Sequence, residues 1–179
     1  MNRRRLELAC QELFPNCLIV RLPALFGPQL TKNFIFDLLN PMPTMLNEAT
    51  YARLASGLPA QLRSALATVY TYSERLGVQV LDRSLLDTLS DRPALEAGAN
   101  ALGINALMFH NRQTTYQFYE IERLVTDIEL TLAADLDCIH LATPPLQADS
   151  IYRVLKGGEM PATKARLHRE DMHTAHAMI

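Results

Sequence analysis

The chain has 179 residues with a formal net charge of −2, and 49% of them are apolar while 20% are charged. This is ordinary globular composition, which argues against extensive disorder. The near-neutral charge provides no basic field for nucleic acid or an anionic membrane, and no stretch reaches the roughly 20 apolar residues of a membrane span. Three scattered cysteines fit reduced cytosolic thiols, so a cytoplasmic location is expected.

Residues 1–40 are predicted to form a helix, a strand and a second helical turn. Apolar residues at helical spacing indicate a helix over residues 5–13. Residues 17–22 are apolar on both faces, as in a parallel strand that helices cover. A loop over residues 23–28 follows, and residues 34–39 are expected to form the next helical turn.

Residues 41–108 are predicted to be a helical segment. Its main helix covers residues 61–76, where apolar side chains recur on one face and Gly77 acts as the stop. Capping residues predict shorter helices at three further points, namely Asn47, residues 82–84 and residues 90–93.

The period changes after residue 108, and residues 109–158 are predicted to be a small α/β lobe. Strands and helices alternate there over residues 115–119, 121–134, 138–142 and 150–155. Residues 159–179 are polar and carry no apolar stripe, so they are expected to form a tail.

The sequence contains no motif that would bind a dinucleotide or activate a nucleophile. Its seven glycines are scattered, so no G-x-G-x-x-G turn brings backbone amides against a pyrophosphate. A P-loop and a G-x-S-x-G motif are also missing. Cys138 lies in an apolar strand without a base at a fixed spacing, which favours a packing role. No catalytic residue is predicted.

Three weaker features each have two interpretations. His173 and His176 could share a helix face as metal ligands, but the spacing fixes no third ligand, so a solvated tail is favoured and no metal is predicted. The arginines at residues 3–5 could contact a phosphate or form a solvated helix end. The aromatic residues at 116–119 could line a ligand pocket or divide between core and surface.

Four segments resemble parts of one known family. Residues 18–28 (LIVRLPALFGP) resemble the strand and loop after the active-site helix in NAD-dependent epimerases and dehydratases, which are extended short-chain dehydrogenases. The family pattern there is close to R-L-P-x-L-F-G. The other three segments are similar to an R-D-F-x-Y-V-x-D motif, a later strand and turn, and a late motif of one branch; they are residues 111–119, 139–145 and 171–177.

The resemblance implies a helix-rich α/β fold, with a partial Rossmann-type strand–helix unit and a mixed α/β substrate-binding lobe. It also implies hydride transfer between NAD or NADP and a sugar-nucleotide-like substrate. The residues it places beside the cofactor are Arg5, Pro23 and Ala24. The residues it places beside the substrate are Asn33, Arg112, Gln117 and Tyr119.

The chain departs from the family at the catalytic Y-x-x-x-K pair. One alignment puts Arg5 at the lysine position and Met1 at the tyrosine position, and another puts Arg3 at the lysine position. Neither supplies the tyrosine, and arginine does not replace lysine freely. Thr115 stands where the family has the arginine of R-D-F, which leaves Arg112 as the nearest candidate for a substrate phosphate.

Two functions follow as alternatives. The first is the C-terminal, substrate-lobe portion of such an oxidoreductase, inactive alone. The second is a non-catalytic binding or interaction module, which forms a homo-oligomer or pairs with a separate Rossmann subunit through exposed strand edges.

Overall fold

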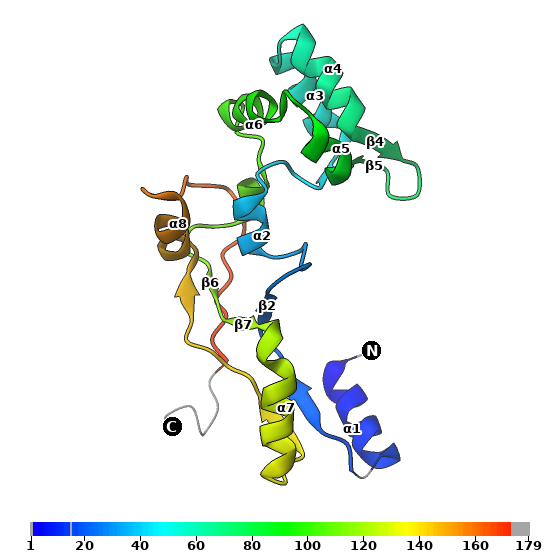
Figure 1. The fold of residues 1–179 in the computed structure, drawn as a ribbon, viewed down its shortest axis with the longest axis vertical. Helices are drawn as coiled ribbons and strands as arrows, with labels where there is room; N and C mark the ends of the chain where they lie inside the picture. The colour runs from blue at the N-terminus through cyan, green and yellow to red at the C-terminus, as the bar shows by residue number, and fades with distance from the viewer. Residues whose placement is uncertain (1, 15, 173–179) are drawn as a thin grey trace.

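The computed structural model describes residues 2–14 and 16–172 of the chain. The molecule is elongated and has two parts (Figure 1). We call residues 42–104, which hold α3 to α6, the helical lobe, and the other described residues the mixed lobe. The predicted helix-rich α/β class is confirmed. Within the described part of the chain, no helix has the length and apolarity that a membrane crossing needs.

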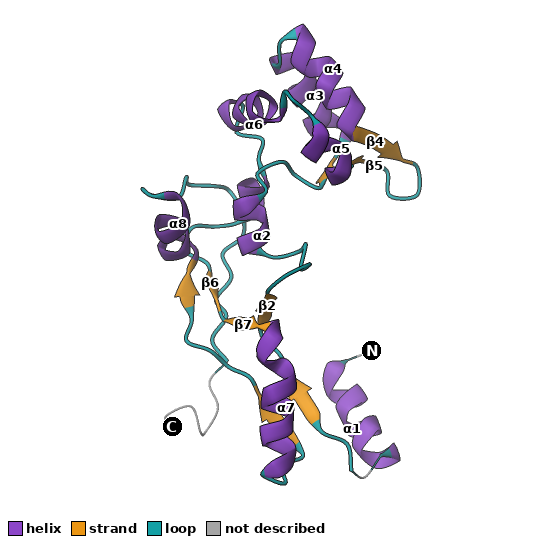
Figure 2. Ribbon diagram, in the orientation of Figure 1, coloured by secondary structure: helices purple, strands orange, loops and turns teal. Residues whose placement is uncertain are grey.

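The mixed lobe is built on short strands that pair two by two (Figure 2). Two of its pairs are parallel and the third is antiparallel. They are β1 (Ile19–Arg21) with β8 (Cys138–His140), β2 (Ala24–Phe26) with β7 (Phe118–Glu120), and β6 (Thr115–Tyr116) with β9 (Leu146–Gln147). Between β1 and β2 lie only Leu22 and Pro23, and a proline has no N–H to donate to a strand ladder.

Four α-helices and two short 3-10 turns complete the mixed lobe. They are α1 (Arg3–Leu13), α2 (Phe34–Leu39), η1 (Ala106–Phe109), η2 (Ile121–Arg123), α7 (Leu124–Ala133) and α8 (Ala148–Lys156). The core of the lobe lies around α2, where Phe34 and Leu38 pack with Phe118, Ala148 and Met160.

The helical lobe has its own core and its own three-stranded antiparallel sheet. The helices are α3 (Glu48–Gly57), α4 (Ala60–Val69), α5 (Arg83–Thr88) and α6 (Arg92–Ala101). The strands, in the order β3-β5-β4, are β3 (Met45–Leu46), β5 (Val78–Leu81) and β4 (Tyr70–Ser73). Buried side chains from all these helices, such as Leu54, Leu66, Leu86 and Leu95, form one cluster.

The predicted helix over residues 61–76 is wrong at its C-terminal end, because Tyr70–Ser73 form β4. Tyr70 is buried, and its hydroxyl donates to the carbonyl of Pro43 at 2.5 Å. Gly77 has φ 65° and lies in the turn between β4 and β5, so the residue expected to stop a helix closes a hairpin instead. The region predicted as a helical segment therefore contains a sheet.

Two further predictions need correction. The loop expected over residues 23–28 contains β2, which pairs with β7. The predicted tail is ordered against the lobe over its first part: Met160 is buried and its N–H donates to Asp149 of α8. His173 and His176 lie outside the described residues.

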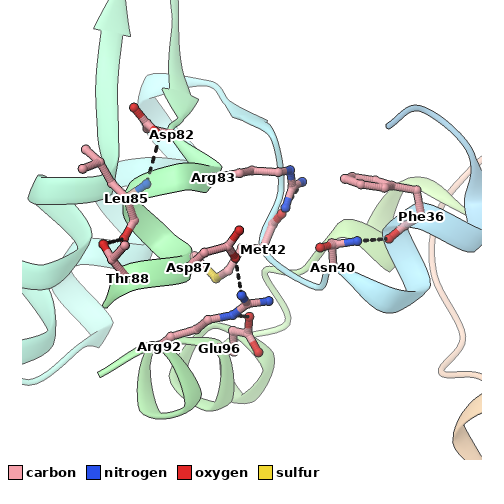
Figure 3. A network of polar contacts seen from close by, with 10 residues as sticks. All are labelled: Phe36, Asn40, Met42, Asp82, Arg83, Leu85, Asp87, Thr88, Arg92 and Glu96. Atoms are coloured by element: carbon pink, nitrogen blue, oxygen red, sulfur yellow. Dashed lines mark hydrogen bonds and ion pairs between the residues drawn. The ribbon is translucent and has the colours of Figure 1, made fainter. Parts of the chain in front are cut away.

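The junction between the two lobes is bridged by Arg83 of α5 (Figure 3). Its guanidinium lies 4.6 Å from the ring centre of Phe36 in α2. It also donates to Thr44 Oγ1 at 2.8 Å and to the carbonyl of Met42 at 3.3 Å. One side chain therefore links the first turn of α5 to the connection between the lobes.

Candidate functional site

A cavity of about 610 Å³ lies at the carboxyl ends of the parallel strands β1 and β8. Arg21 ends β1, His140 ends β8, and both side chains line the cavity. The remaining walls come from α1, from the connection to β2 and from the C-terminal segment, through Arg3, Glu7, Leu22, Pro23 and Met172. In open parallel sheets, ligands bind in the crevice outside the carboxyl ends of the strands. This position makes the cavity the best candidate for a functional site.

The polar centre of the cavity is Arg21, held by Glu7 and His140. Its Nε donates to Glu7 Oε1 at 3.0 Å and its Nη2 donates to Glu7 Oε2 at 2.6 Å, a bidentate arrangement. Its Nη1 lies 2.5 Å from His140 Nε2. Because a guanidinium can only donate, His140 Nε2 is the acceptor in this contact. The Arg21 guanidinium in β1 thus bonds to both α1 and β8.

The ion pair shifts the pKa of each of its two groups in the direction that favours the charged form. The hydrogen bonds from Arg21 lower the pKa of the Glu7 carboxyl, and the hydrogen bond to Glu7 raises the pKa of the Arg21 guanidinium. The pair is open to solvent, so salt screens it. It presents a fixed positive group and a ring nitrogen to anything that enters the cavity.

Of the three residues expected beside a cofactor, one lines this cavity. Pro23 is in its wall, whereas Ala24 is the first residue of β2 and pairs with Phe118. Arg5 is exposed on α1 and does not line the cavity, but Arg3 does. The alignment that puts Arg3 at the family's lysine position is therefore the one that brings an arginine into the site.

Two of the four residues expected to bind substrate have their amide groups already bonded. Asn33 caps α2: its Oδ1 accepts the N–H of Phe36 at 2.7 Å, and its Nδ2 donates to the carbonyl of Leu25 at 2.9 Å. Gln117 is buried, donates to the carbonyl of Thr143 at 2.6 Å and accepts the N–H of Met172 at 2.6 Å. Gln117 thereby holds Met172 in the cavity wall.

The other two differ in exposure. Tyr119 is buried in β7, and its hydroxyl donates to Asp127 Oδ2 at 2.5 Å; burial, followed by this bond, raises its pKa to about 12. Arg112 is half-exposed and has a long ion pair with Glu159, at 3.6 Å. Because that ion pair is long and solvated, it is weak. The guanidinium of Arg112 is therefore available to a ligand, whereas the polar groups of the other three residues are bonded within the protein. The four residues do not line the cavity at β1 and β8.

Two helices of the mixed lobe expose large apolar side chains. Helix α1 has no buried residue, although Leu6, Leu8, Leu13 and Phe14 lie on it or just after it. Helix α7 buries only Thr131 and leaves large apolar side chains exposed, among them Val125, Leu130 and Leu132. Large apolar side chains left exposed on two helices are typical of a surface that another layer of protein covers.

The total surface agrees with this picture. The chain exposes 11941 Å², whereas a compact monomer of its 20.1 kDa is expected to expose roughly 8,700 Å². The difference is roughly 3,200 Å²; the elongated two-part shape accounts for part of it, and the exposed apolar side chains of α1 and α7 contribute to the rest. Both β1 and β8 also keep one edge unpaired in the described part of the chain.

Sequence reasoning did not single out Glu7, Arg21 or His140 as site residues. Arg21 belongs to the R-L-P motif, but the motif alone gave it no role. Its partner His140 is 119 residues away in the sequence, so only the β1–β8 pairing brings the two together. Among residues 2–14 and 16–172, no group of three or more His, Cys, Asp or Glu side chains could hold a metal ion.

Comparison of the chain with protein-family models, curated sequences and solved structures finds no significant match. The family resemblance therefore stays a prediction that rests on the sequence motifs.

Proposed function

We propose that this chain is the C-terminal, substrate-lobe portion of an NAD(P)-dependent epimerase/dehydratase-like oxidoreductase that acts on a sugar-nucleotide-like substrate, and that it is inactive alone. The observation that carries the proposal is the cavity at the carboxyl ends of β1 and β8. A parallel pair with a ligand-sized cavity at this end is the arrangement that dinucleotide-binding α/β folds use.

The uncovered faces of α1 and α7 support the same proposal. In a complete doubly wound sheet, further strands would extend the β1–β8 pair and the apolar sides of both helices would be buried. The part of the cofactor site that a glycine-rich turn would provide has no counterpart in this sequence. The chain thus offers Arg3, Arg21, Pro23 and His140 to one side of a shared site and lacks the other side.

The test of substrate recognition is calorimetric titration of the 179-residue chain with UDP-glucose, as a probe of the sugar-nucleotide class. We expect saturable binding that Arg3→Gln weakens about tenfold, because Arg3 lines this cavity and a charge-assisted hydrogen bond to a phosphate is lost. Arg63→Gln is the matched control, since Arg63 is exposed on α4 in the other lobe. Absence of binding, or equal affinity in both variants, would contradict the proposal.

A second candidate is the interaction module, which the exposed apolar helices favour. Under this function the chain self-associates, or pairs with another subunit, through α1 and α7. Sedimentation equilibrium should show association that Leu132→Asp abolishes and Leu76→Asp preserves, because Leu76 is equally apolar and half-exposed but lies in the hairpin turn of the helical lobe. A chain that stays monomeric at high concentration would count against this candidate.

A further inference from the structure

A second cavity, of about 540 Å³, lies where the two lobes meet. Its walls come from residues 31–37 before and within α2, from residues 43–45 at the start of the helical lobe, and from residues 106–110 where the chain returns. Cavities of this size at the junction of two structural units are a common setting for small-molecule sites. Asn33 is part of the wall, but both of its amide atoms are bonded, so other groups must meet a ligand.

Two cations at the junction have no carboxylate partner. In the described part of the chain, no carboxylate oxygen lies within 4.0 Å of Lys32 or of the Arg83 guanidinium. Lys32 lines the cavity and also an adjoining one of about 510 Å³, which contains Arg83 and shares Thr31 and Thr44 with the first. Arg83 lines only the adjoining cavity, where its guanidinium already donates to Thr44 and Met42, so Lys32 is the cation that an anion in the first cavity would meet.

A fixed polar group faces the same cavity. His110 Nε2 lies 2.7 Å from Asp37 Oδ2, and His110 Nδ1 lies 2.9 Å from the hydroxyl of Tyr116. Burial raises the pKa of Tyr116 to about 12, so its hydroxyl keeps its proton beside the imidazole. Phe34 stacks on Tyr116 and packs edge-on against His110. These contacts hold the imidazole in one orientation and leave neither ring nitrogen free for a ligand.

Two exposed apolar side chains also line the cavity. Met45 and Phe109 line the cavity and remain 46% and 57% exposed, and Pro43 lies beside them. A ligand with an apolar body would bury these side chains, which is favourable in proportion to the area removed from water.

We propose that the cavity between the lobes is a binding site for a small organic anion with an apolar body, such as a phosphate monoester or a carboxylate. Its charged group pairs with Lys32 and its body packs on Met45 and Phe109, while the bonded Asp37–His110 pair forms the opposite wall. Since the walls come from both lobes, the ligand also joins them. This site is separate from the cavity at β1 and β8.

The experiment is calorimetric titration of the 179-residue chain with phenyl phosphate and with benzoate, together with NMR of the methionine methyl groups. We expect saturable binding of at least one probe and a shift of the Met45 methyl signal, which Met45→Leu assigns. Lys32→Gln should weaken binding about tenfold, the loss expected for one charge-assisted contact. Lys164→Gln is the matched control, because Lys164 is exposed and does not line this cavity. The stronger of the two probes tells a phosphate site from a carboxylate site.

Three results would overturn the inference. The first is that neither probe binds saturably. The second is that Lys32→Gln binds the probe as tightly as the wild type does. The third is that inorganic phosphate binds as tightly as phenyl phosphate, which would show that the apolar wall contributes nothing. Circular dichroism of Lys32→Gln confirms that the exposed substitution leaves the fold intact. None of these results bears on UDP-glucose binding, so this inference and the proposed function fail independently.

Discussion

The same substitution at two helical leucines of the mixed lobe measures whether α7 is packed. Leu38 of α2 is 2% exposed, and Leu132 of α7 is 57% exposed. Leu→Ala removes three carbons, which are worth about 2.4 kcal/mol when fully buried, and a rigid core adds a cavity cost. Leu38→Ala should therefore lose about 2–5 kcal/mol. At Leu132 only about two fifths of the side chain is buried, so the loss should stay near or below about 1 kcal/mol.

Urea unfolding followed by far-UV circular dichroism compares the two variants. A destabilisation without a change in compactness lowers the midpoint and leaves the slope unchanged. We expect a large shift of the urea midpoint for Leu38→Ala and a small shift for Leu132→Ala in the isolated chain. If Leu132→Ala costs as much as Leu38→Ala, the apolar face of α7 is already covered, and the reasoning from exposed surface is refuted.

Three further outcomes are expected. Asn33→Ala should cost about 1 kcal/mol by removing the cap of α2, whereas Asn33→Ser, which keeps an acceptor oxygen for the Phe36 N–H, should cost less in the same urea assay. The pKa of Glu7 in the folded chain lies below its ordinary value of 4.5. Its bond to Arg21 therefore stabilises the fold above pH 4.5, and this stabilisation is lost as the pH falls through the folded pKa. Carboxyl ¹³C NMR of Glu7 should show the lowered titration midpoint, and 1 M salt should bring that midpoint closer to 4.5. Gln117→Met should speed hydrogen exchange at the Met172 amide, because that N–H loses its acceptor, and an unchanged exchange rate would show that Gln117 does not hold the segment.

Local chemistry made several elements predictable from the sequence. Asn47 and Asp82 cap α3 and α5 as expected, and a proline stands in the first turn of α6. These signals need only a few neighbouring residues, since a cap forms between residues three apart. The strand at Cys138–His140 and the helix α7 were also predicted at nearly their observed positions.

Elements that depend on distant partners were not predictable in the same way. The spacing of Leu66, Val69 and Tyr70 continues a helical stripe, yet Tyr70 starts a strand because its hydroxyl and backbone find partners in residues 43 and 81. Met160 is a single apolar residue in a polar stretch, and only the fold around α2 shows that it is core.

The residues of the candidate site also differ in how far the sequence predicts them. Pro23 could be placed by motif, but the arginine at the centre of the site could not, because its partners Glu7 and His140 come from separate elements. Residues assigned by resemblance alone, such as Asn33 and Gln117, have local or tertiary bonding roles that a motif does not reveal.

Titration of the 179-residue chain with NADH, followed by the fluorescence of the reduced nicotinamide, tests the central claim most directly. We expect no saturable binding, because the chain supplies Arg3, Arg21 and His140 to one side of a cavity and no glycine-rich turn for the pyrophosphate. Tight, saturable NADH binding by the isolated chain, or conversion of a nucleotide sugar by it, would contradict the claim.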